Sequence, residues 1–115
     1  MPKITGQAKR LRIYIGETDR YNGKSLYHAI VLKAKELDLA GATVFRGIMG
    51  YGANSRIHTA RIVDLSDDLP ILIEIVDSEE YINKILPFLD EVVTEGLVTL
   101  DDVEIIKYGH KELKR

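Results

Sequence analysis

The clearest strand in the sequence reads Ile71-Leu72-Ile73-Glu74-Ile75-Val76. β-Branched residues dominate this stretch, and the residues on either side of it, Pro70 and Asp77-Ser78, are typical of turns. Because side chains alternate across a strand, its isoleucines share one face. A second stretch alternates in the same way and reads Arg10-Leu11-Arg12-Ile13-Tyr14-Ile15-Gly16. We therefore predict two strands, each with one buried apolar face.

Two segments have helical periodicity. From Lys24 to Leu39, apolar residues recur at three- and four-residue spacing, namely Leu26, Ala29, Ile30, Ala34 and Leu37. Asn22 or Ser25 can supply the N-cap of this helix. A second apolar stripe follows residue 78, namely Ile82, Ile85, Leu86 and Leu89, with Asp77 or Ser78 as the N-cap. The spacing predicts two amphipathic helices.

Two further strand segments complete the pattern. Residues 41–49 read as a strand after the first helix, and residues 97–100 and 103–108 read as a final strand or strand pair. The order β-α-β-β-α-β predicts an α+β ferredoxin-like sandwich, with a four-stranded antiparallel sheet and two helices on one face. We expect a loose N-terminal arm over 1–8, one domain over 9–109 and a charged tail over 110–115.

The sheet face away from the helices is predicted to carry a mixture of apolar and charged side chains, namely Arg12, Tyr14, Leu72, Glu74 and Val76. Arg12 and Glu74 can pair across adjacent strands there. We expect other subunits to cover this face. The alternative is an exposed face with scattered apolar residues, which is common in proteins.

Composition excludes several classes of function. The chain has 115 residues, no cysteine and a formal charge of -2, from 16 Lys and Arg against 18 Asp and Glu. The missing basic excess argues against a nucleic-acid binder, and the missing cysteine excludes disulfides and thiolate sites. We find no run of about 20 apolar residues for membrane insertion and no catalytic motif. We therefore expect a cytoplasmic protein that is not an enzyme.

Three stretches resemble a prokaryotic family grouped as PII-like signalling proteins. They are residues 11–17, the stretch Gly41 to Gly52, and Ser55-Arg56-Ile57-His58-Thr59. The resemblance implies a ferredoxin-like homotrimer that binds adenine nucleotides between subunits and signals to a protein target through a long loop, here residues 50–68. Ala53 stands where PII proteins have an arginine, and residues 94–98 lack their glycine- and lysine-containing phosphate loop. A smaller adenylate such as AMP, or another anion, is therefore the expected ligand.

The candidate ligand-binding residues gather around this loop. Gly47, Gly50 and Gly52 have a spacing that can let backbone N–H groups approach a phosphate, or can simply allow a bulge and a tight turn. The cationic candidates are Arg46, Arg56 and His58, with Arg61 nearby. They can form an anion pocket, or they can be solvated and paired with the carboxylates of the same region, Asp64, Asp67 and Asp68.

Other residue types carry weaker signals. Tyr14, Tyr51 and Tyr108 can stack on a base, although strand tyrosines are more often packing residues. The three histidines, at positions 28, 58 and 110, have no metal-ligand spacing, so we predict no metal site and no obligatory cofactor. Two alternatives to a nucleotide-binding regulator stay open. One is a divalent-metal protein of the CutA type, and the other is an adaptor that binds a membrane transporter through its loop without a ligand.

Overall fold

The computed structural model of the chain describes residues 5–51, 58–59 and 68–110. Within these residues, two helices and four main strands make up the domain, and four two-residue strands form small hairpins. In chain order the elements are β1 (Gly6–Gly16), β2 (Arg20–Tyr21), β3 (Lys24–Ser25), α1 (Leu26–Glu36), β4 (Thr43–Arg46), β5 (Met49–Gly50), β6 (His58–Thr59), β7 (Pro70–Asp77), α2 (Glu79–Val92) and β8 (Leu97–Ile105). The predicted α+β ferredoxin-like fold is confirmed.

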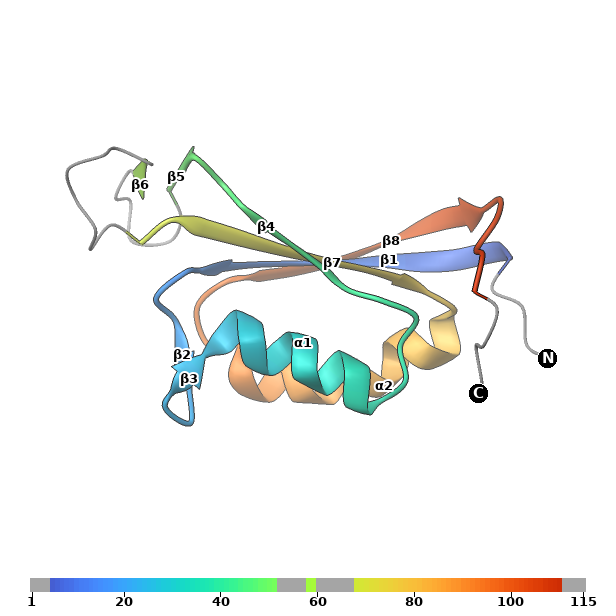
Figure 1. Ribbon diagram of the computed structural model, residues 1–115, viewed down its shortest axis with the longest axis horizontal. Helices are drawn as coiled ribbons and strands as arrows, with labels where there is room; N and C mark the ends of the chain where they lie inside the picture. The colour runs from blue at the N-terminus through green and yellow to red at the C-terminus, as the bar shows by residue number, and fades with distance from the viewer. Residues whose placement is uncertain (1–4, 52–57, 60–67, 111–115) are drawn as a thin grey trace.

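The main sheet has the strand order β4-β7-β1-β8, and every neighbouring pair is antiparallel. β1 and β7 lie at its centre, with Ile13 opposite Ile73 and Arg12 opposite Glu74. Both helices cover the same face of this sheet, as predicted, and leave the other face open (Figure 1). Because Gly16 lies opposite Pro70 and Arg46 lies opposite Ile71, the ends of β1 and β4 and the start of β7 lie at one end of the sheet.

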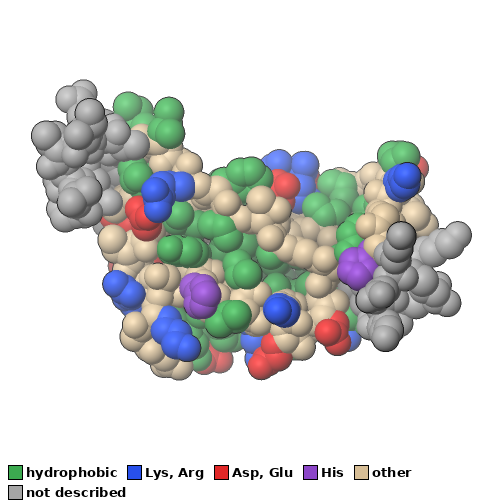
Figure 2. All heavy atoms as spheres, in the orientation of Figure 1, with side chains coloured by type: hydrophobic (Ala, Val, Ile, Leu, Met, Phe, Trp, Pro, Cys, Tyr) green, Lys and Arg blue, Asp and Glu red, His purple; other side chains and the backbone are tan. Residues whose placement is uncertain are grey.

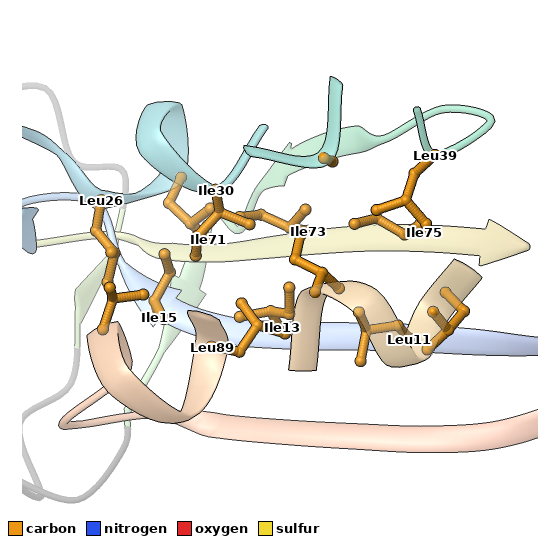
Figure 3. Packing of buried hydrophobic residues seen from close by; sticks show 14 residues of the cluster. Leu11, Ile13, Ile15, Leu26, Ile30, Leu39, Ile71, Ile73, Ile75 and Leu89 are labelled. Atoms are coloured by element: carbon orange, nitrogen blue, oxygen red, sulfur yellow. The ribbon is translucent and has the colours of Figure 1, made fainter. Parts of the chain in front are cut away.

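The core lies between the sheet and the two helices. The inward residues of β1 and β7 are those that the alternation predicted, Leu11, Ile13, Ile15, Ile71, Ile73 and Ile75, and all are buried. Ile30 from α1 and Leu89 from α2 pack against them (Figure 3). Burying one such aliphatic side chain stabilises the fold by roughly 1.5–3 kcal/mol, so this layer is the main source of stability.

The start of α1 differs from the sequence-based expectation. Lys24 and Ser25 belong to a small β2–β3 hairpin, not to the helix. Its two turn residues, Asn22 and Gly23, have φ angles of 51° and 78°, which is the backbone that a tight two-residue hairpin requires. Ser25 occupies the N-cap position of α1 without a side-chain cap hydrogen bond. The hairpin pairs only two residues on each side, too few for any periodicity.

The start of α2 agrees with the prediction. Ser78 is the N-cap, and its Oγ accepts a hydrogen bond from the backbone N–H of Tyr81 at 3.3 Å. Asp77, the last residue of β7, is fully buried. Its carboxylate accepts hydrogen bonds from the backbone N–H groups of Ala40 at 2.9 Å and Ser78 at 2.7 Å. One side chain thus joins the end of the central strand to the connection between α1 and β4.

β1 and β8 are longer than predicted. β1 begins at Gly6, so three residues of the expected arm belong to the sheet, and Ala8 is buried. The two final strand segments form one continuous strand, β8, which pairs with β1 from Gly6 to Tyr14. The two strands continue past the helices at one end (Figure 1). Ion pairs between Lys9 and Asp102 and between Arg10 and Asp101 cross this ribbon.

Candidate ligand-binding site at the end of the sheet

The predicted site residues gather where β4 ends and β7 begins. Arg46 is the last residue of β4 and Gly47 follows it. Gly50 ends β5, and its backbone pairs with that of His58 in β6. The structure therefore brings four of the six predicted residues to one end of the sheet by their backbones. The other two, Gly52 and Arg56, lie outside the described residues, as does Arg61.

Arg46 forms an ion pair with a residue that the sequence analysis did not connect to it. Its Nη2 lies 2.5 Å from Oε2 of Glu17, which directly follows β1. The arginine side chain is 61% exposed and that of Glu17 only 24%. Of the carboxylates considered as partners for this region, Asp64 and Asp67 lie outside the described residues. Asp68 instead accepts a hydrogen bond from the backbone N–H of Thr18 at 2.8 Å.

Gly47 and Gly50 are explained by packing. A Cβ atom on Gly47 would lie 2.6 Å from Cγ of Pro70, and one on Gly50 would lie 3.0 Å from the same atom. The backbone N–H of Gly47 donates to the carbonyl oxygen of Pro70 at 2.7 Å. That N–H group is therefore engaged within the protein, and glycine at this position permits the close approach of two chain segments.

Arg46 and Leu69 flank the 50–68 segment and are called its first and second roots. The turn after β1 contacts the second root. The backbone N–H of Glu17 donates to the carbonyl oxygen of Leu69 at 2.8 Å. Asp19 stabilises the turn itself, because its Oδ2 accepts from the N–H of Gly16 at 3.0 Å. Glu17 thus contacts Leu69 through its backbone and Arg46 through its side chain. In sequence, only its place directly after a strand end could have hinted at this role.

The three tyrosines considered for stacking have different surroundings. Tyr51 is strongly exposed beside β5, and Tyr14 is exposed on the open sheet face. Tyr108 has the packing role, because its hydroxyl donates to the carbonyl oxygen of Ala40 at 3.0 Å and its ring stacks on His110. Tyr51 directly follows Gly50 and is therefore adjacent to the predicted ligand-binding residues.

The open sheet face has the mixed character that the sequence predicted. Arg12 and Glu74 form the expected cross-strand pair, with Nε 3.2 Å from Oε2. Large apolar side chains beside this pair remain exposed, with Tyr14 at 39%, Phe45 at 46% and Leu97 at 56%. Figure 2 views the sheet from its edge, and hydrophobic side chains appear at the upper margin, where the open face lies, and next to the grey segment near β5. This surface is more apolar than a face built for contact with water.

Residues 5–51, 58–59 and 68–110 contain no group of three or more histidine or acidic residues that could hold a metal ion. None of the helices described there is both long and apolar enough to cross a membrane. A shallow groove of about 270 Å³ lies between the β2–β3 hairpin, α1 and Phe88 of α2, and contains none of the predicted site residues.

Comparisons with known proteins give a family match and several relatives. The model of the DUF190 family, described as "Uncharacterized ACR", matches residues 8–105. A UPF0166 protein of Aquifex aeolicus is 44% identical over 100 residues, covering 85% of this chain and 92% of that protein. A UPF0166 protein of Methanocaldococcus jannaschii is 41% identical over 102 residues, covering 88% of this chain and 94% of that protein.

Solved structures show the same fold at lower sequence identity. A putative PII-like signalling protein of Thermus thermophilus matches with a TM-score of 0.64 and 20% identity, over 90% of this chain and 93% of that one. CPII, a nitrogen regulatory PII-like protein of Thiomonas intermedia, matches with a TM-score of 0.60 and 18% identity, over 86% of this chain and 88% of that one. The CPII structure holds ADP, AMP and bicarbonate.

Proposed function

Because the chain belongs to the DUF190 family and has the fold of PII-like signalling proteins, we propose that it is a PII-like regulatory protein and not an enzyme. The membership confirms the family resemblance of the sequence motifs. The proposed ligand is a small anion, an adenine nucleotide such as AMP, bound in clefts between the subunits of a cytoplasmic homotrimer. Binding changes how the 50–68 segment fits a protein target, through a difference in ligand affinity between two states.

The observation that carries this proposal is the position of Arg46. Its guanidinium is mostly exposed at the end of β4, where the chain enters the 50–68 segment. Guanidinium groups bind phosphate through paired, charge-assisted hydrogen bonds. A ligand held by Arg46 therefore acts directly on one root of the segment, and Gly50 and the backbone of His58 lie at the same end of the sheet.

The CPII complex supports the class of ligand. That protein shares only the fold with this chain, and it was solved with adenine nucleotides and bicarbonate. Both kinds of molecule are anions that an exposed arginine can bind. AMP is favoured over ATP here because residues 94–98, which lead into β8 and include its first two residues, contain no lysine and one glycine. They therefore offer little to hold a triphosphate.

The open sheet face supports the homotrimer. Phe45 and Leu97 are exposed on it, at opposite edges of the four-stranded sheet. Covering such residues against another subunit removes apolar surface from water, at about 25 cal/mol per Å². Light scattering coupled to size-exclusion chromatography is expected to give three times the 13.0 kDa mass of one chain. The mass of a single chain would contradict binding between subunits.

The ligand is tested by isothermal titration with AMP, ADP, ATP and inorganic phosphate. We expect AMP to bind, and we expect Arg46→Ala to weaken binding about ten- to a hundredfold, the effect of losing a charged hydrogen-bond pair. Arg20→Ala is the matched control, because Arg20 is an exposed arginine on β2 outside the candidate site. No heat with any nucleotide, or equal affinity in the two variants, would contradict the proposal.

A further inference from the structure

Glu17 occupies the position on Arg46 that a bound anion would take. The distance between its Oε2 and Nη2 of Arg46 is 2.5 Å, which leaves no room for a ligand oxygen between the two groups. We infer that Glu17 is the specificity-determining residue of this site, an internal counter-ion that an incoming anion must displace. The inference rests on the proposed function, because it takes Arg46 as the group that binds the ligand.

The turn that carries Glu17 is held in place by its backbone. The N–H of Glu17 donates to Leu69, the N–H of Thr18 donates to the Asp68 carboxylate, and the N–H of Gly16 donates to Asp19. The side chain of Glu17 can rotate while these bonds persist, since none of them involves its carboxylate. The turn therefore keeps the Glu17 backbone in place beside Arg46, and only the side chain has to move when an anion arrives.

Displacement favours one class of anion. The arginine side of this ion pair is open to solvent, and ion pairs screened by water contribute little to stability, so a strongly charged ligand can replace Glu17. A phosphate monoester carries nearly two negative charges and binds guanidinium through two hydrogen bonds. A simple carboxylate has the same charge and the same hydrogen-bonding oxygens as the Glu17 side chain. Glu17 has the advantage that the turn already holds it next to Arg46. The site therefore selects phosphate monoesters, such as AMP, over singly charged carboxylates.

The same residue connects the two roots of the 50–68 segment. Arg46 lies at the first root and Leu69 at the second, and Glu17 contacts both. When the ligand turns the Glu17 carboxylate away from Arg46, the local field changes at the Glu17 and Thr18 amides, which hold the second root. Ligand binding at Arg46 thus changes the surroundings of residues at both ends of the segment.

The experiment compares Glu17→Gln with wild type by titration of AMP, inorganic phosphate and acetate. Glutamine keeps the shape of the side chain but removes the competing charge, so we expect AMP and phosphate to bind about two- to fivefold more tightly, the range that an exposed ion pair supports. Acetate should gain relatively more, because the variant no longer holds a carboxylate of its own. The matched control is Glu36→Gln, because Glu36 pairs with Lys33 on α1, away from the site.

Each outcome separates the inference from the proposed function. If wild type binds AMP and Glu17→Gln binds it equally or more weakly, the inference is wrong and the proposed function stands. If AMP binds to neither protein but phosphate binds more tightly to Glu17→Gln than to wild type, the inference about the anion site stands and the proposed nucleotide function is wrong. If neither protein binds either anion, both are wrong. The second readout is the NMR chemical shift of the backbone amides of residues 17 and 18 during the phosphate titration. Chemical shifts that do not change would refute the coupling between the roots.

Discussion

Replacing the buried Asp77 with alanine is expected to be among the most destabilising single changes at the ends of the sheet. The Asp77 side chain is fully buried and accepts hydrogen bonds from the backbone N–H groups of Ala40 and Ser78. It therefore anchors the connection between α1 and β4 to the end of β7. Alanine would leave two N–H groups in this region without their acceptor.

The magnitude follows from these two bonds. A hydrogen bond to a charged acceptor contributes about 1.5–3 kcal/mol, and an unsatisfied buried donor has a similar penalty. Removing the buried carboxylate also removes the cost of taking its charge out of water, which reduces the loss. We expect Asp77→Ala to lower the free energy of unfolding by about 3 kcal/mol. Asp77→Asn keeps one acceptor oxygen and should lose about half as much.

Urea unfolding followed by circular dichroism measures this loss. All proteins must be compared at one chain concentration, because the stability of an oligomer depends on it. Asp90→Ala is the control, since Asp90 is an exposed aspartate on α2. If Asp77→Ala unfolds within 1 kcal/mol of wild type, Asp77 does not anchor the connection and the argument fails.

Three further changes test other parts of the structure. Gly47→Ala should lower the melting temperature, because the new Cβ would lie 2.6 Å from Cγ of Pro70 and relieving such overpacking costs about 1–3 kcal/mol; an unchanged melting temperature would contradict the packing. Arg10 hydrogen-bonds Asp101 and lowers the pKa of that carboxyl. The pair therefore stabilises the fold at pH values above the pKa that Asp101 has in the unfolded chain, and this contribution is lost as pH falls through its pKa in the folded protein. Acid unfolding of Asp101→Asn should therefore lack that portion of the pH dependence, and identical profiles would refute the pair's role. Phe45→Asp should shift the mass seen by light scattering from trimer to single chain, and an intact trimer would remove the open face from the interface.

Much of the fold could be predicted because its core strands have strong local patterns. The alternation of apolar residues in β1 and β7 identified six buried core residues, although not Ala8 or Asp77. It also placed Arg12 and Glu74 together on the other face. The β2–β3 hairpin was missed because strands of two residues have no period. The start of β1 was missed because Gly6 and Ala8 have low strand propensity, and only pairing with β8 makes them part of the sheet.

The candidate site was less predictable. Arg46 could be named from its place in a motif, but its partner Glu17 comes from a different strand end and meets it only through the antiparallel order of β4, β7 and β1. Gly47 carried an ambiguous signal, because glycine permits a close approach to a ligand and to another chain segment equally well. Its contact is with Pro70, and local sequence holds no information about that contact.

The position of β1 has a consequence for synthesis of the protein. β1 is synthesised well before its two neighbours in the sheet, β7 and β8. Until β7 and β8 have been synthesised, both edges of β1 are unpaired, and unpaired strand edges can associate with other chains. The basic residues Lys9, Arg10 and Arg12, which later form ion pairs, keep the waiting strand charged. We therefore expect the charges that form ion pairs in the folded sheet to disfavour association of the unpaired strand with other chains.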